Sequence, residues 1–356
     1  MAKLTSPQIS VTFTELGISA ITRGSKGTVA LIVRDEAAQA PFAITQASQT
    51  PAVLGKETQD YIKRTFLGYV TPPRKVIVYV LGAQEELTDA LDYMAAQTFD
   101  YICGPASCTA QEAADIASWV KSQRLNNGAK YKAVLPNHPA DNYAIVNFTG
   151  DAMTDGAAVW ATAEYCSRIA GLLAGTPMKI SATYAPLPEL SDCARLTKDE
   201  SDEAVGAGEL ALRWDGRKVK LNRAVTSLVT TSQGMLDSFK KIKIVEIMDL
   251  IRTDISATAE DEYVGKYANS YDNKMLLVAA IRGYFMGLER DQLVQPGYTV
   301  DIDVDAQEQY LASRGVDTEA MSERELREAD TGSQVFILVR CKILDAIEDI
   351  LVAVEI

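Results

Sequence analysis

The sequence predicts an α/β chain, α+β overall, because short apolar strands alternate with amphipathic helices over its first half. Segments rich in Val, Ile and Tyr and bounded by Gly, Pro or Asn are typical of buried strands. They are 28–34, 75–81, 99–105, 131–137 and 143–150. Apolar residues spaced three and four apart, as in amphipathic helices, occur in 55–69, 83–97 and 109–124. This alternation indicates a parallel or mixed sheet with helices packed on its faces.

The rest of the chain mixes helices, turns and strands. Apolar spacing predicts a helix over 157–173, and prolines, a charge run and glycines then predict a connector over about 176–215. The dipeptide Asp215-Gly216 favours a two-residue hairpin. Two helices are predicted next, over about 237–257 and about 272–290. A turn and the strand after it follow at 296–304, and a long strand is predicted over 327–344.

Both ends of the chain read as half-buried strands. Apolar and polar residues alternate there, with Ile9, Val11 and Phe13 on one face near the start, and Val352, Val354 and Ile356 opposite Leu351, Ala353 and Glu355 at the end. An unpaired apolar edge strand promotes aggregation, so we expect both strands to pair by design. Pairing with each other within one subunit is the alternative to pairing with other chains. A polar stretch, 345–349, is expected to act as a hinge before the last strand.

Composition narrows the class of protein. The 356 residues suffice for two or three domains, with 47% hydrophobic and 23% charged residues, which is ordinary for globular proteins. No apolar run approaches the roughly 20 residues of a membrane-spanning helix, and no signal peptide is visible, so synthesis is expected to end in the cytosol. The net charge of −13 argues against nucleic-acid binding. Five scattered cysteines predict reduced thiols without a disulfide.

No motif predicts catalytic, cofactor-binding or metal-binding residues. His138 lies in a loop beside two prolines, and Cys103 and Cys108 lack the spacing of zinc or redox sites. The stretch Asp301-Ile-Asp-Val-Asp305 resembles the start of a calcium loop, but Ala stands at its sixth and twelfth positions, where Gly and Glu are needed. Its alternation instead predicts carboxylates on the solvent face of a strand. No phosphate-binding Gly-Lys-Ser loop occurs.

Basic residues concentrate in one region of this acidic chain. Between Arg213 and Lys243 the sequence has eight Lys and Arg against Asp215 and Asp237, a local net charge of 8 − 2 = +6. Such a patch predicts an acidic partner, and an ordinary solvated surface is the alternative.

Several stretches resemble a known family. The segments 214–230, 237–255 and 263–297, which begin "WDGRKVKL", "DSFKKIKI" and "YVGKYANS", resemble the C-terminal domain of contractile tail sheath proteins. The stretches "FDYICGP", "VLPN" and "IVNF" are similar to compact sheath subunits of Gram-positive prophage tails and R-type bacteriocins, with a diffocin as the nearest likeness. The resemblance covers most of the chain and is strongest after residue 210.

The resemblance implies an N-terminal α/β sandwich domain ahead of a C-terminal α+β sheath domain, with extended strand arms at both ends. The expected boundaries are 1–20 for the N-terminal arm, 21–200 for the outer domain, 201–345 for the tube-facing domain and 346–356 for the C-terminal arm. Arms of neighbouring subunits would complete a small sheet on a third subunit by strand addition. The residues implied in these inter-subunit arms are Ile9, Val11, Phe13, Leu351, Val352, Val354 and Ile356.

The resemblance also implies partners and a mechanical role. The chain would polymerise helically around an inner tail tube, meet baseplate and tail terminator proteins, and contract without a nucleotide or other cofactor. It would be assembled in the bacterial cytoplasm and leave in a phage tail or bacteriocin particle, with no nucleic acid or membrane as partner. Lys240, Lys241, Lys243 and Arg252 are expected to face the tube. The alternatives are an α/β enzyme with a site of scattered residues, or a closed-ring capsid or tube protein.

Overall fold

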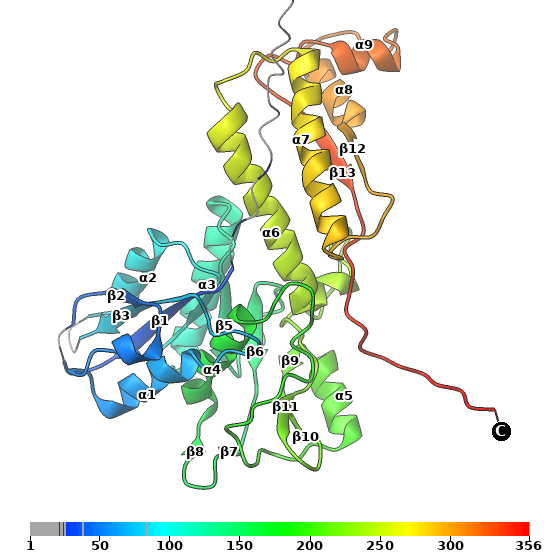
Figure 1. Cartoon of the computed structure of the whole chain (residues 1–356). Coiled ribbons are helices and arrows are strands. Elements are labelled where there is room, and N and C mark those ends of the chain that lie inside the picture. Colours follow the sequence, from blue (N-terminus) through cyan, green and yellow to red (C-terminus); the bar gives the residue numbers. More distant parts are fainter. Residues whose placement is uncertain (1–20, 22–23, 25, 38, 83–84, 356) are drawn as a thin grey trace, which may run out of the picture. The chain divides into compact units, whose positions relative to one another are not determined.

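The computed structural model describes residues 21, 24, 26–37, 39–82 and 85–355 (Figure 1). Contacts divide them into two compact units. The sheet unit consists of the described residues of Arg23–Thr253, Asp291–Leu293 and Ile343–Ile356. The α7 unit contains Asp254–Arg290 and Val294–Lys342. The division falls within helix α6 (Ile242–Thr258), well beyond the predicted domain boundary at 200/201.

A seven-stranded sheet, in the order β2-β3-β1-β4-β5-β6-β9, forms the centre of the sheet unit. β2 runs antiparallel to β3, and the other neighbours are parallel, so the predicted mixed sheet is confirmed. Its strands are β1 Thr28–Arg34, β2 Phe42–Ile44, β3 Lys75–Leu81, β4 Tyr101–Cys103, β5 Lys132–Pro136, β6 Ile145–Phe148 and β9 Glu209–Leu210.

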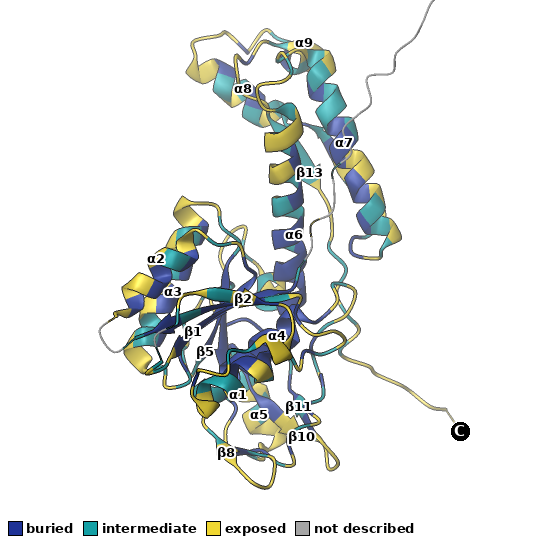
Figure 2. Ribbon diagram, turned by 60° about the vertical axis from the view of Figure 1, so that its left-hand side comes forward, coloured by how far each residue is buried: buried dark blue, intermediate teal, exposed yellow. Residues whose placement is uncertain are grey.

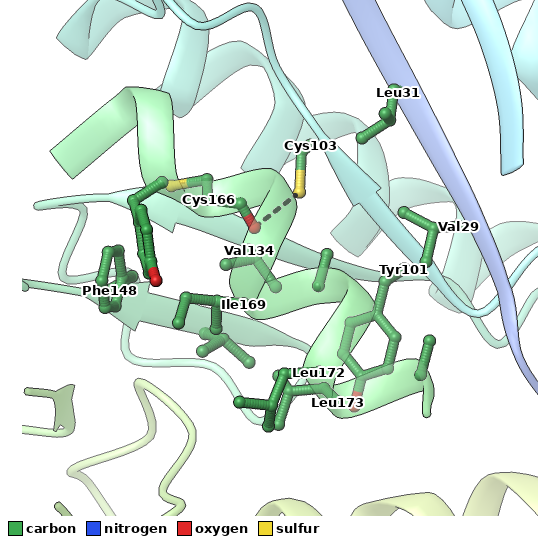
Figure 3. Packing of buried hydrophobic residues seen from close by; sticks show 14 of the residues in the cluster. Val29, Leu31, Tyr101, Cys103, Val134, Phe148, Cys166, Ile169, Leu172 and Leu173 are labelled. Atoms are coloured by element: carbon green, nitrogen blue, oxygen red, sulfur yellow. Dashed lines mark hydrogen bonds between the residues drawn. The ribbon is translucent and has the colours of Figure 1, made fainter. Parts of the chain in front are cut away.

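Helices cover both faces of this sheet. α1 (Lys56–Thr65) and α4 (Thr162–Ala174) pack on the face that carries Val29 and Leu31, and α2 (Leu87–Ala95) and α3 (Ala110–Asn126) pack on the face of Ala30 and Ile32. Figure 3 shows part of the first core, where Ile169 and Leu172 of α4 lie near Tyr101 and Val134 of the sheet. These side chains are buried, because each parallel strand has helices on both sides.

The predicted connector contains regular structure. α5 (Lys198–Gly206) begins with a capping box, in which Thr197 and Glu200 exchange hydrogen bonds, and β9 follows it into the sheet. A two-stranded ladder, β7 (Met153–Thr154) with β8 (Val159–Trp160), precedes α4. The predicted hairpin is confirmed, because β10 (Leu212–Trp214) pairs antiparallel with β11 (Val219–Leu221). The predicted two-residue turn at Asp215-Gly216 is wrong in its position, because Trp214 pairs with Val219 and residues 215–218 connect the strands. Gly216 has φ +92°, which favours glycine.

The α7 unit is built on one long helix and one small sheet. α7 (Tyr271–Arg290) packs on β12 (Thr299–Ile302), and β12 pairs antiparallel with β13 (Ile337–Arg340). Val300 and Ile302 are buried. Helices α8 (Val304–Ser313) and α9 (Glu323–Glu328) pack together. Short helical turns complete the elements described, at Ala47–Gln49, Asp237–Lys240 and Ala259–Tyr263.

The predicted strand through Asp301, Asp303 and Asp305 is wrong after Ile302. β12 ends at that residue, and the side chain of Asp303 accepts a 3.1 Å hydrogen bond from the Ala306 N–H as the N-cap of α8. A short acidic side chain satisfies one of the amides that a helix N-terminus leaves unpaired. Asp305 therefore lies in the first turn of a helix rather than on the face of a strand.

Candidate functional site

The last described residues form an exposed apolar segment. Residues 350–355 have no strand assignment among the described parts of the chain, and Ile350 is 74% exposed, with Leu351, Val352 and Val354 at least as exposed. Figure 2 shows this segment in yellow. An exposed run of large apolar side chains marks an interaction site. The other predicted arm residues, Ile9, Val11, Phe13 and Ile356, lie outside the described residues.

The segment just before it is bound to the sheet unit. The Leu344 N–H donates a 2.8 Å hydrogen bond to the Leu293 carbonyl oxygen. Lys241 forms an ion pair with Asp345, and Arg223 pairs with Asp349 at 2.6 Å. The Arg223 guanidinium holds the pKa of Asp349 below its ordinary value. In the single chain, therefore, Asp345 and Asp349 hold the predicted hinge at 345–349 against Lys241 and Arg223 of the sheet unit.

The four lysine and arginine residues predicted to face a tube do not share one open surface. Lys240 pairs with Asp237 at 3.0 Å, and Lys241 is engaged by Asp345. The side chain of Lys243 is buried, and burial lowers its pKa. Arg252 is exposed. Charge counting alone could not separate these surroundings, because it ignores that Lys240 and Lys241 lie before α6 whereas Lys243 and Arg252 lie within it.

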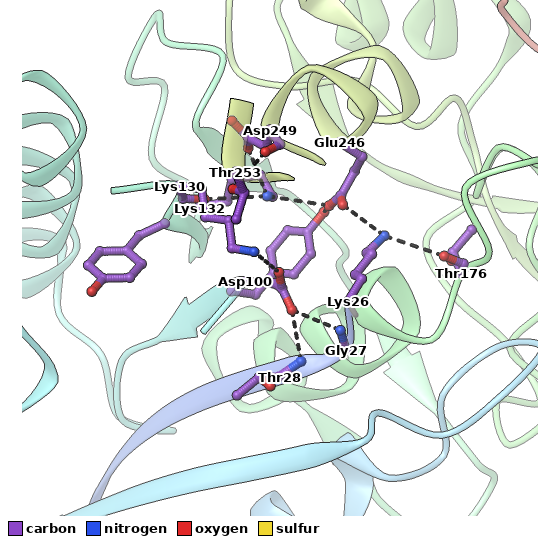
Figure 4. Close-up of polar contacts among 12 residues, drawn as sticks. Lys26, Gly27, Thr28, Asp100, Lys130, Lys132, Thr176, Glu246, Asp249 and Thr253 are labelled. Carbon is purple, nitrogen blue, oxygen red and sulfur yellow. Dashed lines mark hydrogen bonds and ion pairs between the residues drawn. The ribbon is translucent and has the colours of Figure 1, made fainter. Parts of the chain in front are cut away.

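A buried charge cluster, which the sequence analysis missed, fastens α6 to the sheet (Figure 4). Glu246 and Asp249, three residues apart on α6, both face Lys132 at the start of β5, with N···O distances of 3.6 and 3.0 Å. Arg124 of α3 pairs with Asp249 at 2.6 Å, and Lys26 pairs with Glu246 at 3.0 Å. Two features of the sequence could have indicated this cluster. Glu246 and Asp249 are acidic residues within an otherwise apolar helix, and Lys132 is a lysine at the start of an apolar strand.

The electrostatics of this charge cluster favour the charged forms of Asp249, Lys132 and Arg124. Burial alone would raise the pKa of Asp249, but Lys132 and Arg124 hold it below its ordinary value. The Tyr101 hydroxyl also donates a hydrogen bond to Glu246. A buried charge is tolerated only when it is paired and hydrogen-bonded. The cluster therefore positions the first half of α6 against the starts of β4 and β5.

The opposite ends of the strands, where α/β enzymes bind ligands, border an open hollow whose lining includes Arg34, Gly55 and Leu81. Asp35, which follows β1, accepts hydrogen bonds from the Gly55 and Ala37 N–H groups at 2.8 and 2.9 Å. Its carboxylate thus occupies the N-terminus of α1, the position in which an anionic ligand would bind.

His138 is partly buried in its loop, and burial with nearby Lys121 lowers its pKa. Within the described ranges, no group of three or more His, Cys, Asp or Glu could hold a metal ion. None of the helices described is long and apolar enough to span a bilayer. Cys103, Cys108, Cys166, Cys193 and Cys341 are free thiols.

Comparisons with known proteins agree with the resemblance. Residues 83–227 match the family model of the phage tail sheath protein central domain, and residues 237–356 match that of the phage tail sheath C-terminal domain. The tail sheath protein of Clostridium phage phiCD119 is 36% identical over 352 residues, which are 98% of each chain.

Solved structures share the fold. The sheath tail protein of Desulfitobacterium hafniense superposes with a TM-score of 0.69 at 16% identity, covering 83% of this chain and 94% of that one. A chain of the anti-feeding prophage baseplate gives a TM-score of 0.66 at 12% identity, covering 99% of both chains. The matched domains and the identity along nearly the whole length show that this chain belongs to the phage tail sheath family and is a structural subunit of a contractile tail sheath.

Proposed function

We propose that this chain polymerises helically around an inner tail tube, and that contraction of the polymer drives the tube through the envelope of a target cell. The observation that carries the proposal is the exposed apolar segment 350–355, which follows a fastened stretch of chain. An apolar strand at a chain end needs a partner for its backbone groups, and a second copy of the same chain is the partner that a helical polymer supplies.

The two-stranded sheet of the α7 unit is the proposed acceptor. In the described part of the chain β12 and β13 pair only with each other, so each has one edge open to strand addition. Residues 350–356 of one neighbour and the strand of Ile9, Val11 and Phe13 from another would extend this sheet. Each buried Val or Ile would contribute about 1.5–3 kcal/mol, and each ladder hydrogen bond about 0.5–1.5 kcal/mol.

The proposed partners beyond other copies are the inner tube protein, baseplate proteins and a tail terminator. Of the basic residues predicted to face the tube, the exposed Arg252 could meet acidic tube residues directly. Lys240 and Lys241 would first have to leave their ion pairs, and Lys243 its buried position. The role is mechanical rather than catalytic. Assembly would occur in the bacterial cytoplasm, followed by release in a phage tail or bacteriocin particle.

Negative-stain electron microscopy of the purified full chain and of a variant lacking residues 350–356 tests this function. The full chain should form helical tubes or stacked rings, and the truncated chain should stay monomeric with an unchanged melting temperature. A chain whose residues 350–356 are replaced by Gly and Ser is the control for length. Tubes formed equally well by all three proteins would refute the exchange of C-terminal arms, and a full chain that never polymerises would refute the sheath proposal.

A further inference from the structure

The side chain of Glu348 lies at the centre of the contacts that fasten the C-terminal segment. It is 5% exposed although it belongs to an otherwise accessible stretch of chain. Its Oε1 accepts hydrogen bonds from the hydroxyls of Ser181 and Thr183 at 3.0 and 2.6 Å. Its Oε2 lies 3.4 Å from Arg223 Nε and 3.4 Å from Lys241 Nζ. Oε1 thus accepts two hydrogen bonds, whereas the buried Oε2 lies within ion-pair distance of two cations and accepts no hydrogen bond from the described residues.

These four groups converge from separate parts of the sheet unit. Ser181 and Thr183 lie in the loop after α4, Arg223 follows β11, and Lys241 immediately precedes α6. The hydroxyl of Thr183 also accepts a 3.0 Å hydrogen bond from the Ala224 N–H, which fixes its position. A buried carboxylate is costly unless it is paired and hydrogen-bonded, so this arrangement is specific for an acid at position 348.

The apolar residues around Glu348 do not contribute to the attachment. Ile347 is 87% exposed and Ile350 is 74% exposed, so the segment is held by its acids and by the Leu344 amide rather than by apolar burial. Beside Glu348, Asp345 pairs with Lys241 and Asp349 pairs with Arg223. Ion pairs and hydrogen bonds are directional, so they set an orientation as well as a position.

We propose that Glu348, Ser181, Thr183, Arg223 and Lys241 form an arm-root clamp, a set of positioning residues that fixes the direction in which residues 350–356 leave the subunit. The pivot of the arm then lies after Asp349 rather than within 345–349. This inference rests on the proposed exchange of C-terminal arms. A clamped root presents the arm to a neighbour with less conformational freedom to lose, and such preorganisation strengthens binding.

Variants at Glu348 in the full-length chain test the clamp. Glu348→Ala removes all four contacts, whereas Glu348→Gln loses the charge and keeps an oxygen that Ser181 and Thr183 can bond. Amide hydrogen exchange over residues 343–349 in the monomer should be fastest in Glu348→Ala and intermediate in Glu348→Gln. The protein concentration needed for polymerisation should rise about tenfold or more in Glu348→Ala. Arg217→Glu, on the exposed hairpin turn, is the charge control and should match the wild type.

The outcomes separate the clamp from the arm exchange. In one outcome the amide hydrogens of Glu348→Ala exchange as fast as those of the wild type and the variant polymerises normally, while the chain lacking 350–356 fails to polymerise. That outcome refutes the clamp and leaves the exchange of arms between subunits standing. If the truncated chain polymerises normally, the arm exchange itself is refuted. High salt should raise the polymerisation threshold of the wild type more than that of Glu348→Ala, because salt screens partly exposed ion pairs. An equal salt response would argue against electrostatic positioning.

Discussion

Two segments of similar composition have opposite surroundings in this chain. β1, "TVALIVR", lies between β3 and β4, and all its side chains except that of Arg34 are buried on the two faces of the sheet. The C-terminal "ILVAVE" at 350–355 has its side chains exposed. Both consist of residues that favour strands. The difference shows that composition determines the tendency to form a strand, whereas the source of the hydrogen-bonding partner determines where the strand forms.

The two segments also differ in the hydrogen bonding of their backbone groups. Amides and carbonyls of β1 pair with β3 along the whole strand. Those of 350–355 have no strand partner in the single chain and are exposed to water, as expected because unpaired backbone groups are seldom buried in native structures. In an assembled sheath the second segment would come to resemble the first. The predictions below alter one segment or its supports and measure whether the monomer or the polymer responds.

The largest effect is expected from two substitutions in the exposed segment. Val352→Ser combined with Val354→Ser should leave the melting temperature of the monomer unchanged and raise the threshold for polymerisation at least about a hundredfold. Two buried valines contribute about 3–6 kcal/mol to a strand interface, and 1.4 kcal/mol is a factor of ten. Sedimentation of polymer against protein concentration measures the threshold. Ala353→Ser, on the opposite face, is the control, and a double variant that polymerises like it would contradict the prediction.

The second largest effect is expected in the buried charge cluster, which lies at the starts of β4 and β5 in the same sheet as β1. Asp249→Asn leaves Arg124 and Lys132 without their common carboxylate, and breaking a buried ion pair costs about 3–5 kcal/mol. The pKa of Asp249 is lowered in the fold, so its stabilisation is present above the ordinary pKa and is lost as the pH falls through the lower, folded value. The difference in unfolding free energy between wild type and variant should therefore shrink in acid.

Chemical denaturation at pH 7 and at successively lower pH values measures this difference. The exposed Asp60→Asn on α1 is a matched control, with little change expected at any pH. A difference that persists undiminished in strong acid would show that Asp249 contributes by packing rather than by charge.

The smallest effect is expected from an Ile→Val substitution, made once in β1 and once in the exposed segment 350–355. Ile32→Val in β1 should lower the unfolding free energy by about 0.5–1.5 kcal/mol, because Ile32 is fully buried. The same change at Ile350 should leave the monomer unaffected, since that side chain is 74% exposed. Equilibrium denaturation of the two variants beside the wild type provides the comparison. Equal losses would mean that 350–355 packs on the monomer in solution.

The sequence predicted the central sheet well because parallel strands buried on both faces are continuous apolar runs. The prediction for 75–81 coincides with β3 and that for 28–34 with β1. It missed α5, which has no buried residue and therefore no apolar periodicity. The capping box of Thr197 and Glu200 was the available signal. α8 was missed for a related reason: alternating Asp residues imitate a strand until Asp303 is recognised as a helix cap.

The functional surface was predictable only in part. The apolar alternation of 350–356 predicted an arm, and the structure shows residues 350–355 exposed, while their role in joining subunits stays a prediction. The arm-root contacts could not be predicted, because Glu348, Thr183 and Arg223 are far apart in sequence and meet only through the tertiary fold. The tube-facing role of the basic residues also stays a prediction, although the structure distinguishes exposed Arg252 from buried Lys243.

Cryo-electron microscopy of the assembled sheath tests the central claim most directly, because it locates residues 350–356 among the subunits. The account predicts that they form a strand hydrogen-bonded to the β12–β13 sheet of a different subunit, with Glu348 still bound within its own subunit. A map in which 350–356 pairs with its own subunit, or lies unpaired along the outside of the polymer, would contradict the account.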